Sequence, residues 1–394
     1  MNFKKKIYTI SYFDVNQKNG GAIFAKNMNT FLNETELFES EVYCNYRKVS
    51  VENQIGININ FRETSLKDKI KNTLKASSTF ELFIHFVRND FNAFFLSLKL
   101  FLTNKIKRES ILLFHDHLSL FYFSLFNNLG KCKLVMIMHN DGFPAKMVSS
   151  GLKSNSKRNL LNKITDYQIK SVINNVNKVV FLCDSARNNF INLYNIPVEN
   201  TTTIPNGINS EYNVNKKKTD SSILEFITVC TMNERKGIDT FIECLPFLNE
   251  KYKSIINFTL IGQGPLLEDL KYLSSKHNNI NVVGESNNVS EYLQNSDVFF
   301  LLSKNEGQPL SITEALSSSL FILATNVGCN ESMVTEGNGI LVDANQASVL
   351  EAFFNVIENW QFLKHKGQNS LDLYNKLFTE KKMYESYINI FKEL

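Results

Sequence analysis

Residues 305–316 read NEGQPLSITEAL and directly follow the apolar run at 298–302. That run has the composition of a strand buried on both faces of a parallel sheet. After the break we expect a helix with Pro309 in its first turn, where no backbone N–H is needed. This stretch therefore predicts a strand–loop–helix unit of an α/β sheet. Glu306 would lie in the loop and Glu314 one turn into the helix.

The free N–H groups and the positive pole of this predicted helix would lie between the two carboxylates. Such a helix start binds anions, and carboxylates accept hydrogen bonds from sugar hydroxyls. A ligand with phosphates and a sugar would therefore suit the stretch. A capped surface helix with two solvated glutamates is the alternative, and this stretch alone leaves both open.

Apolar runs alternate with helical patterns along the rest of the chain, which predicts right-handed βα units and mostly parallel sheets. At 394 residues the chain exceeds a single core, so two domains are expected. We predict an N-terminal domain at 1–207, a polar, Lys-rich linker at 208–222 and a C-terminal domain at 223–374. A final helix at about 375–394 would pack back on the N-terminal domain. The predicted strands are 7–13, 42–44, 111–114, 134–138, 178–183, 224–230, 258–261, 281–283, 298–302, 321–324 and 339–342.

The charge is unevenly distributed. Residues 1–220 hold 30 Lys and Arg against 18 Asp and Glu, and the remainder holds 13 against 21, which gives net charges of +12 and −8. The basic half could meet an anionic acceptor or membrane surface, and residues 61–108 read as two basic, apolar helices. Ordinary core helices in a Lys-rich chain are the alternative. No nucleic-acid partner is expected.

Neither a signal-peptide core nor an apolar run of about 18 residues is present in the sequence. We therefore expect a cytoplasmic protein, with peripheral attachment to the inner face of the cell membrane as an option.

Two further features fall at predicted strand ends. Gly20 and Gly21 lie between the first strand and the first helix, where backbone N–H groups can approach a ligand closely, although a plain turn would look the same. His139 follows the strand at 134–138, and open α/β sheets place ligand-binding groups at such ends. No histidine or cysteine spacing supports a metal site.

Together these pieces resemble the retaining glycosyltransferases of GT-B fold, specifically the family-4 type (glycosyl transferases group 1). The resemblance covers most of the chain and is strongest from about residue 200. The motifs that carry it are Gly20-Gly21, His139, Pro205-Asn206-Gly207-Ile208, Arg235-Lys236-Gly237, Gly262-Gln263-Gly264-Pro265, Glu306-x₇-Glu314, Asn326-Val327-Gly328 with Glu331, and residues 337–342.

The resemblance implies two Rossmann-like βα domains that face each other across a cleft, with the acceptor on the N-terminal side and the nucleotide sugar on the C-terminal side. It implies transfer of a sugar, of hexosyl or N-acetylhexosaminyl type, from a nucleotide-diphosphate donor, expected to be a UDP-sugar. The acceptor would be a hydroxyl of a glycan, a lipid-linked sugar or a cell-envelope polysaccharide. The anomeric configuration would be retained, and no metal or other cofactor is expected.

The resemblance also implies residue roles. Lys236, helped by Arg235, would hold the diphosphate; Glu314 would bind the ribose; and Glu306 would face the donor sugar. His139 would lie near the transferred sugar, which makes His139, Glu306 and Lys236 the expected catalytic group. Further donor contacts would come from the backbone at Gly20, Gly21, Gly307, Leu310 and Ser311.

The chain departs from the family pattern at three places. Thr231 stands where the family usually has an arginine, Ser319 where it has a glycine, and Gln308-Pro309 where Phe-Gly is common. Thr231 and Ser319 keep open the alternative of a catalytically weakened GT-B partner subunit. A GT-B epimerase or phosphorylase is a further alternative.

Overall fold

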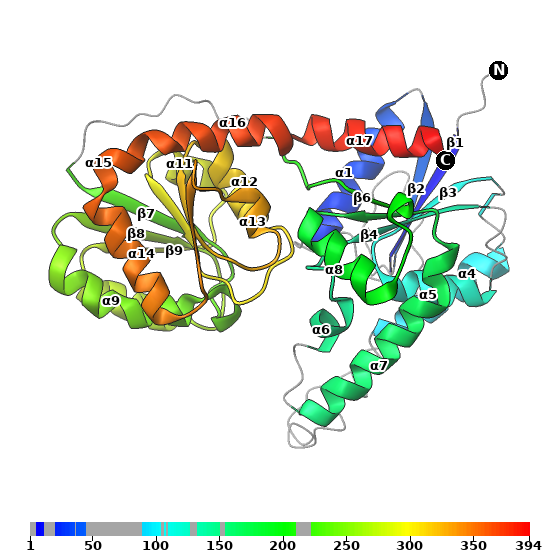
Figure 1. The fold of residues 1–394 in the computed structure, drawn as a ribbon, viewed down its shortest axis with the longest axis horizontal. Coiled ribbons are helices and arrows are strands. Elements are labelled where there is room, and N and C mark those ends of the chain that lie inside the picture. The colour runs from blue at the N-terminus through cyan, green and yellow to red at the C-terminus, as the bar shows by residue number, and fades with distance from the viewer. Residues whose placement is uncertain are drawn as a thin grey trace. The chain divides into compact units, whose positions relative to one another are not determined.

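The computed structural model divides the chain into two compact units, each built around one sheet (Figure 1). The first unit comprises Met1–Ile204 with Ser386–Leu394, and the second comprises Pro205–Glu385. The structure describes residues 5–11, 20–35, 37–44, 89–103, 106–107, 109–126, 132–149, 154–209 and 222–394. The first of the two helices predicted within 61–108 and most of the predicted linker lie outside the described residues, so the linker stays a prediction.

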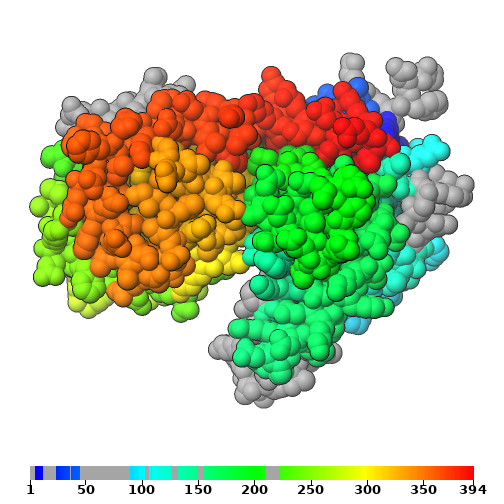
Figure 2. Space-filling view, viewed as in Figure 1, coloured from blue at the N-terminus to red at the C-terminus, as the bar shows by residue number. Residues whose placement is uncertain are grey.

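The first unit has a six-stranded parallel sheet in the order β2-β1-β3-β4-β5-β6. Its strands are β1 (Lys5–Ser11), β2 (Phe38–Cys44), β3 (Ile111–Phe114), β4 (Lys133–Met138), β5 (Lys178–Phe181) and β6 (Thr201–Thr203). The helices between them are α1 (Gly20–Glu34), α4 (Phe91–Thr103), α5 (His117–Phe126), α6 (Pro144–Ser149), α7 (Asn155–Val172) and α8 (Asp184–Tyr194). In Figure 2, α7 is seen at the surface of this unit, where Tyr167 is exposed.

The second unit repeats this architecture with the order β12-β11-β10-β7-β8-β9. Its strands are β7 (Leu224–Val229), β8 (Ile256–Ile261), β9 (Ile280–Gly284), β10 (Val298–Leu301), β11 (Phe321–Thr325) and β12 (Gly339–Val342). Its helices are α9 (Ile238–Tyr252), α10 (Leu267–Lys276), α11 (Val289–Gln294), α12 (Leu310–Ser317), α13 (Asn330–Met333), α14 (Gln346–Glu358), α15 (Trp360–Leu363) and α16 (Gly367–Leu377). The last helix, α17 (Glu380–Glu393), completes the chain.

Strand β10 shows why its sequence is apolar without alternation. Val298 and Phe300 pack into the core on one face of the sheet, whereas Phe299 and Leu301 pack into the core on the other. A strand that is covered on both faces needs apolar side chains in both directions. The two six-stranded parallel sheets confirm the prediction of an α/β fold with two Rossmann-like domains.

Pro309 lies one position earlier than predicted. It is the N-cap of α12, with φ −73° and ψ 117°, and Leu310 is the first helical residue. The proline ring fixes φ but leaves ψ free, so an extended ψ ends the loop and the helix starts after it.

Candidate functional site

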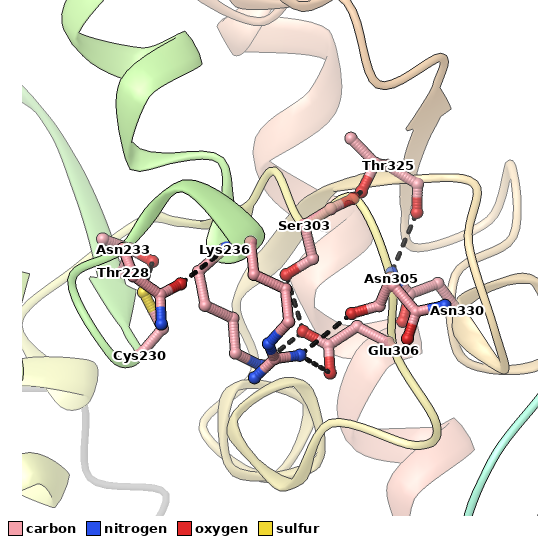
Figure 3. A network of polar contacts seen from close by, with 10 residues as sticks. Thr228, Cys230, Asn233, Lys236, Ser303, Asn305, Glu306, Thr325 and Asn330 are labelled. Carbon is pink, nitrogen blue, oxygen red and sulfur yellow. Dashed lines mark hydrogen bonds and ion pairs between the residues drawn. The ribbon is translucent and has the colours of Figure 1, made fainter. Parts of the chain in front are cut away.

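In the second unit, the Glu306 carboxylate is the centre of a cluster of polar contacts (Figure 3). Its Oε1 accepts hydrogen bonds from Lys236 Nζ and from Ser303 Oγ, the latter at 2.6 Å. Its Oε2 lies 3.9 Å from Arg235 Nη1. Glu306 is only 6% exposed, so its charge is held mainly by these groups rather than by water.

The topology of the sheet explains how residues 70 positions apart come together. Strands β7 and β10 are parallel neighbours, so their carboxyl ends reach the same edge. A short 3₁₀ turn at Glu234–Lys236 follows β7, and the Glu306 loop follows β10. The Lys236 backbone N–H donates to Asn233 Oδ1 at 3.0 Å, which caps that turn.

Gly237 allows the turn to pack against the end of β10. Its φ is +71°, and a Cβ at this position would lie 1.9 Å from the carbonyl oxygen of Leu302. Only glycine tolerates both the left-handed backbone and this approach. The glycine of the Arg235-Lys236-Gly237 motif thus has a structural reason that the sequence did not reveal.

The Glu306 loop is also held from the segment that follows β11. The N–H of Cys329 donates to the carbonyl of Gly307 at 2.9 Å. Gly328 has φ +58°, and a Cβ there would lie 2.2 Å from the carbonyl oxygen of Glu306. This close contact restricts the backbone that carries the carboxylate.

A third restraint comes from the side chain of Gln308. Its Oε1 accepts from the Asn206 N–H at 2.7 Å, and its Nε2 donates to the Asn206 carbonyl at 3.0 Å. Both residues are buried. The family departure at position 308 therefore creates a reciprocal pair of hydrogen bonds between the Glu306 loop and the Pro205–Ile208 segment.

Helix α12 carries the other expected donor ligands. Leu310 and Ser311 are its first two residues, and the first N–H groups of a helix have no acceptor within the helix. Glu314 lies one turn further on, where burial raises the pKa of its carboxyl from 4.5 to about 7. Within the described part of the chain, no hydrogen bond or ion pair joins Glu314 to Lys236 or Glu306.

In the first unit, His139 is paired with a second histidine. Its Nε2 lies 3.0 Å from Nδ1 of His115, and the two ring planes differ by 12°. Strands β3 and β4 are neighbours, which brings the residues after them together. Burial lowers the pKa of His139 to about 4, and burial together with His139 lowers that of His115. Both rings are therefore neutral at pH 7.

The aromatic ring of Phe24 covers this pair, with ring centroids 5.3 Å from His115 and 5.9 Å from His139. Phe24 belongs to α1, whose first residues are Gly20 and Gly21. The structure thus places the glycine pair and His139 in one unit and links the glycine helix to the histidines. In the described residues, no group of three or more His, Cys, Asp or Glu side chains is arranged to hold a metal.

The other two departures lie before the 3₁₀ turn and after the end of α12. Thr231 is exposed and precedes the 3₁₀ turn. Arg235 Nη1 donates to the Asn305 carbonyl at 3.1 Å and therefore supplies a guanidinium beside the Glu306 loop. Ser319 has φ +59°, which is the left-handed conformation that favours the glycine of the family pattern.

Sequence reasoning did not single out Ser303 or Asn206 as parts of the site. Ser303 directly follows the apolar run at 298–302, and no local pattern distinguishes a buried serine from a loop serine. The unusual Gln308 marks a departure from the family pattern, but nothing in the local sequence identifies Asn206, 102 positions away, as its partner.

Two family models match the chain. "Glycosyl transferases group 1" matches residues 210–371, and "Glycosyltransferase Family 4" matches residues 76–212. Among similar curated proteins is the O-antigen biosynthesis glycosyltransferase WbnH of Escherichia coli, 35% identical over 121 residues, which are 29% of this chain and 35% of that protein. Another is the UDP-Gal:alpha-D-GlcNAc-diphosphoundecaprenol alpha-1,3-galactosyltransferase of Escherichia coli, 34% identical over 105 residues, or 25% of this chain and 26% of that protein.

These matches span about a quarter to a third of the length of the two relatives.

A solved structure, Anabaena Alr3699/HepE in complex with UDP, superposes with a TM-score of 0.66 at 13% identity, covering 99% of this chain and 100% of that one. At this identity the likeness shows a shared fold.

Proposed function

This chain belongs to the glycosyl transferases group 1 family and has the GT-B fold, and from that premise we propose that it is a retaining glycosyltransferase. It moves a hexosyl or N-acetylhexosaminyl group from a nucleotide-diphosphate donor to a hydroxyl of a glycan, lipid-linked or cell-envelope polysaccharide acceptor. The observation that carries the proposal is the buried Glu306 carboxylate with Lys236 and Arg235 beside it, at the edge of the sheet from which α12 begins.

The donor diphosphate is bound by positive charge and by backbone donors. Lys236 and Arg235 supply the cations, and the N–H groups of Leu310 and Ser311 bind the distal phosphate. Glu314 accepts hydrogen bonds from the ribose, and Glu306 from hydroxyls of the sugar. A UDP-sugar is our preferred donor, supported by the UDP bound to the structural neighbour and by the UDP-Gal in the name of the relative.

Transfer breaks the bond between the anomeric carbon and the diphosphate oxygen and forms a bond from that carbon to the acceptor oxygen. The acceptor proton passes to the departing phosphate on the same face of the sugar, which retains the configuration. Stabilisation of the negative leaving group by Lys236, Arg235 and the helix pole is the main catalytic contribution. His139, neutral at pH 7, acts as a hydrogen-bonding partner of the sugar rather than as a proton carrier.

The test combines nucleotide binding with transfer. We expect UDP to bind the wild type in calorimetry, and thermal shift with a panel of nucleotide sugars to identify the donor. Lys236→Ala should lower kcat by about 100-fold or more, because a donor to the leaving group is lost. Glu314→Ala should weaken UDP binding by about tenfold or more, as expected for loss of a charge-assisted hydrogen bond.

Lys271→Ala is the matched control, because Lys271 is an exposed lysine on α10 that pairs with its helix neighbour Glu268. Turnover unchanged in Lys236→Ala would contradict the site. A wild type that binds no nucleotide would favour a non-catalytic partner subunit. Product analysis with labelled donor separates transfer from epimerisation and phosphorolysis.

A further inference from the structure

Ser303 connects strand β10 to the carboxylate that faces the donor sugar in our proposal. It lies two residues after the last strand residue, Leu301, and its side chain is fully buried. Its hydroxyl donates to Glu306 Oε1 at 2.6 Å (Figure 3). A hydrogen bond from a neutral donor to a buried carboxylate is charge-assisted and therefore stronger than one between neutral groups.

The backbone of Ser303 is itself held in place. Thr325 Oγ1 donates to the Ser303 carbonyl at 2.6 Å, and Asn330 Nδ2 donates to the Thr325 carbonyl at 2.8 Å. These three residues are fully buried and come from the ends of β10 and β11 and from the start of α13. The hydroxyl that meets Glu306 is thus the last member of a connected series of hydrogen bonds.

The two carboxylate oxygens of Glu306 have different contacts. Among the described residues, Oε1 accepts from both Ser303 and Lys236, whereas the contact of Oε2 is the more distant Arg235 at 3.9 Å. An oxygen with two donors has used both lone pairs. Oε2 is therefore the oxygen with capacity for a hydroxyl of the donor sugar.

We propose that Ser303 is a positioning residue that holds Glu306 in place when Lys236 turns from the carboxylate to the donor diphosphate. This inference rests on the proposed function. Lys236 pairs with Glu306 in the structure, and in the proposed function it binds the donor diphosphate. Once Lys236 turns away, Ser303 is the close donor that keeps Oε1 paired and Oε2 directed at the sugar. Without that hydroxyl, the buried carboxylate rotates or follows Lys236.

The experiment compares how tightly the full chain binds UDP and UDP-sugars. Calorimetry with UDP, UDP-glucose, UDP-galactose and UDP-N-acetylglucosamine gives the wild-type preference for a sugar-bearing nucleotide over UDP. In Ser303→Ala we expect this preference and kcat each to fall about tenfold, while UDP binds nearly as in the wild type. Ser303→Thr keeps the hydroxyl and should restore both.

Ser296→Ala is the matched control. Ser296 is also buried and its hydroxyl donates to a backbone carbonyl, that of Tyr292, at 2.8 Å. Among the described residues, no hydrogen bond joins Ser296 to the Glu306 cluster, so a similar loss of stability should leave the sugar preference unchanged.

Failure of the positioning role and failure of the proposed function give different results in this experiment. If the wild type prefers a UDP-sugar and Ser303→Ala keeps both that preference and kcat, the positioning role is wrong and the glycosyltransferase proposal stands. If Ser303→Ala weakens UDP and UDP-sugars equally and melts earlier, Ser303 is structural and the inference is again wrong. If the wild type binds none of the four nucleotides, the UDP-sugar donor of the proposed function is wrong, and the inference that rests on it fails with it.

Discussion

The charge of Glu314 depends on its burial. Burial raises the pKa of its carboxyl from 4.5 to about 7, so near neutral pH it is partly protonated in the folded protein and ionised in the unfolded chain. The folded state thus binds more protons than the unfolded state between these two values. By linkage, the contribution of Glu314 to stability is fully present below pH 4.5 and is lost as the pH rises through 7.

Glu314→Gln should remove this pH dependence, because the amide keeps the shape of the side chain but does not titrate. We expect the variant to gain stability relative to the wild type as the pH rises from 4.5 to 7 and to keep that difference constant above. Urea unfolding at a series of pH values measures it. A wild type and a variant that respond to pH in parallel would show that the pKa is not raised.

The same group predicts proton release on nucleotide binding. Ribose hydroxyls that donate to Glu314 favour its ionised form and lower its pKa. At pH 7 the wild type should therefore release a fraction of a proton when UDP binds, and Glu314→Gln should release less. Calorimetry in buffers of different ionisation enthalpy detects the difference; equal release by both proteins would place the ribose elsewhere.

At the scale of elements, Gly328 and Gly337 both follow β11 and offer a test variant and its control. In Gly328→Ala, a Cβ would meet the Glu306 carbonyl oxygen at 2.2 Å on a backbone with φ +58°. A left-handed alanine costs about 1–2 kcal/mol before the clash is counted, so the Glu306 loop must move. Gly337→Ala places its Cβ no closer than 3.4 Å to the Thr335 hydroxyl, without a left-handed φ. Assays should show transfer strongly reduced in the first variant and close to wild type in the second.

The hydrogen bonds between Gln308 and Asn206 make a second prediction at this scale. Gln308→Ala leaves the buried N–H and C=O of Asn206 without their side-chain partner, which should destabilise the second unit by about 2–4 kcal/mol. Gln368→Ala, at an exposed glutamine on α16, should change stability by less than about 0.5 kcal/mol. Fluorescence of Trp360, the single tryptophan, follows unfolding of this unit. Equal midpoints for the two variants would contradict the role of Gln308.

For the whole molecule, the alternation of buried strands and helices was sufficient to predict the fold class, because strands such as β10 are covered on both faces. The order of strands was not predictable in the same way. Strand β10 lies between β7 and β11, and that placement alone brings Lys236 to Glu306. The donor motifs could be named from the resemblance, but the contacts of Ser303, His115 and Asn206 depend on which strand ends become neighbours.

The distribution of charge leads to a prediction for the molecule as a whole. Among the described residues, none of the helices combines the length and apolar character needed to cross a bilayer. Residues 1–220 nevertheless carry a net charge of +12, and α4 exposes Phe101 and Leu102, which are 49% and 71% accessible. We expect co-sedimentation with phosphatidylglycerol vesicles that weakens as salt is added.

Replacing both Phe101 and Leu102 by serine should reduce this binding, because apolar area would be lost from the membrane-facing side. Tyr272→Ser, at an exposed aromatic residue of the acidic second unit, is the control. Equal binding to neutral vesicles, or binding that salt does not change, would rule out attachment through basic residues.

The central place of β10 has a consequence for how the site behaves over time. Amide hydrogens in the middle of a sheet, covered by apolar cores on both faces, exchange with solvent only when the whole unit opens. The Glu306 loop is anchored directly to that strand and to the end of β11. Deuterium should therefore enter the loop late, and a donor that binds there should meet a loop backbone already in position, with little entropy lost in ordering it.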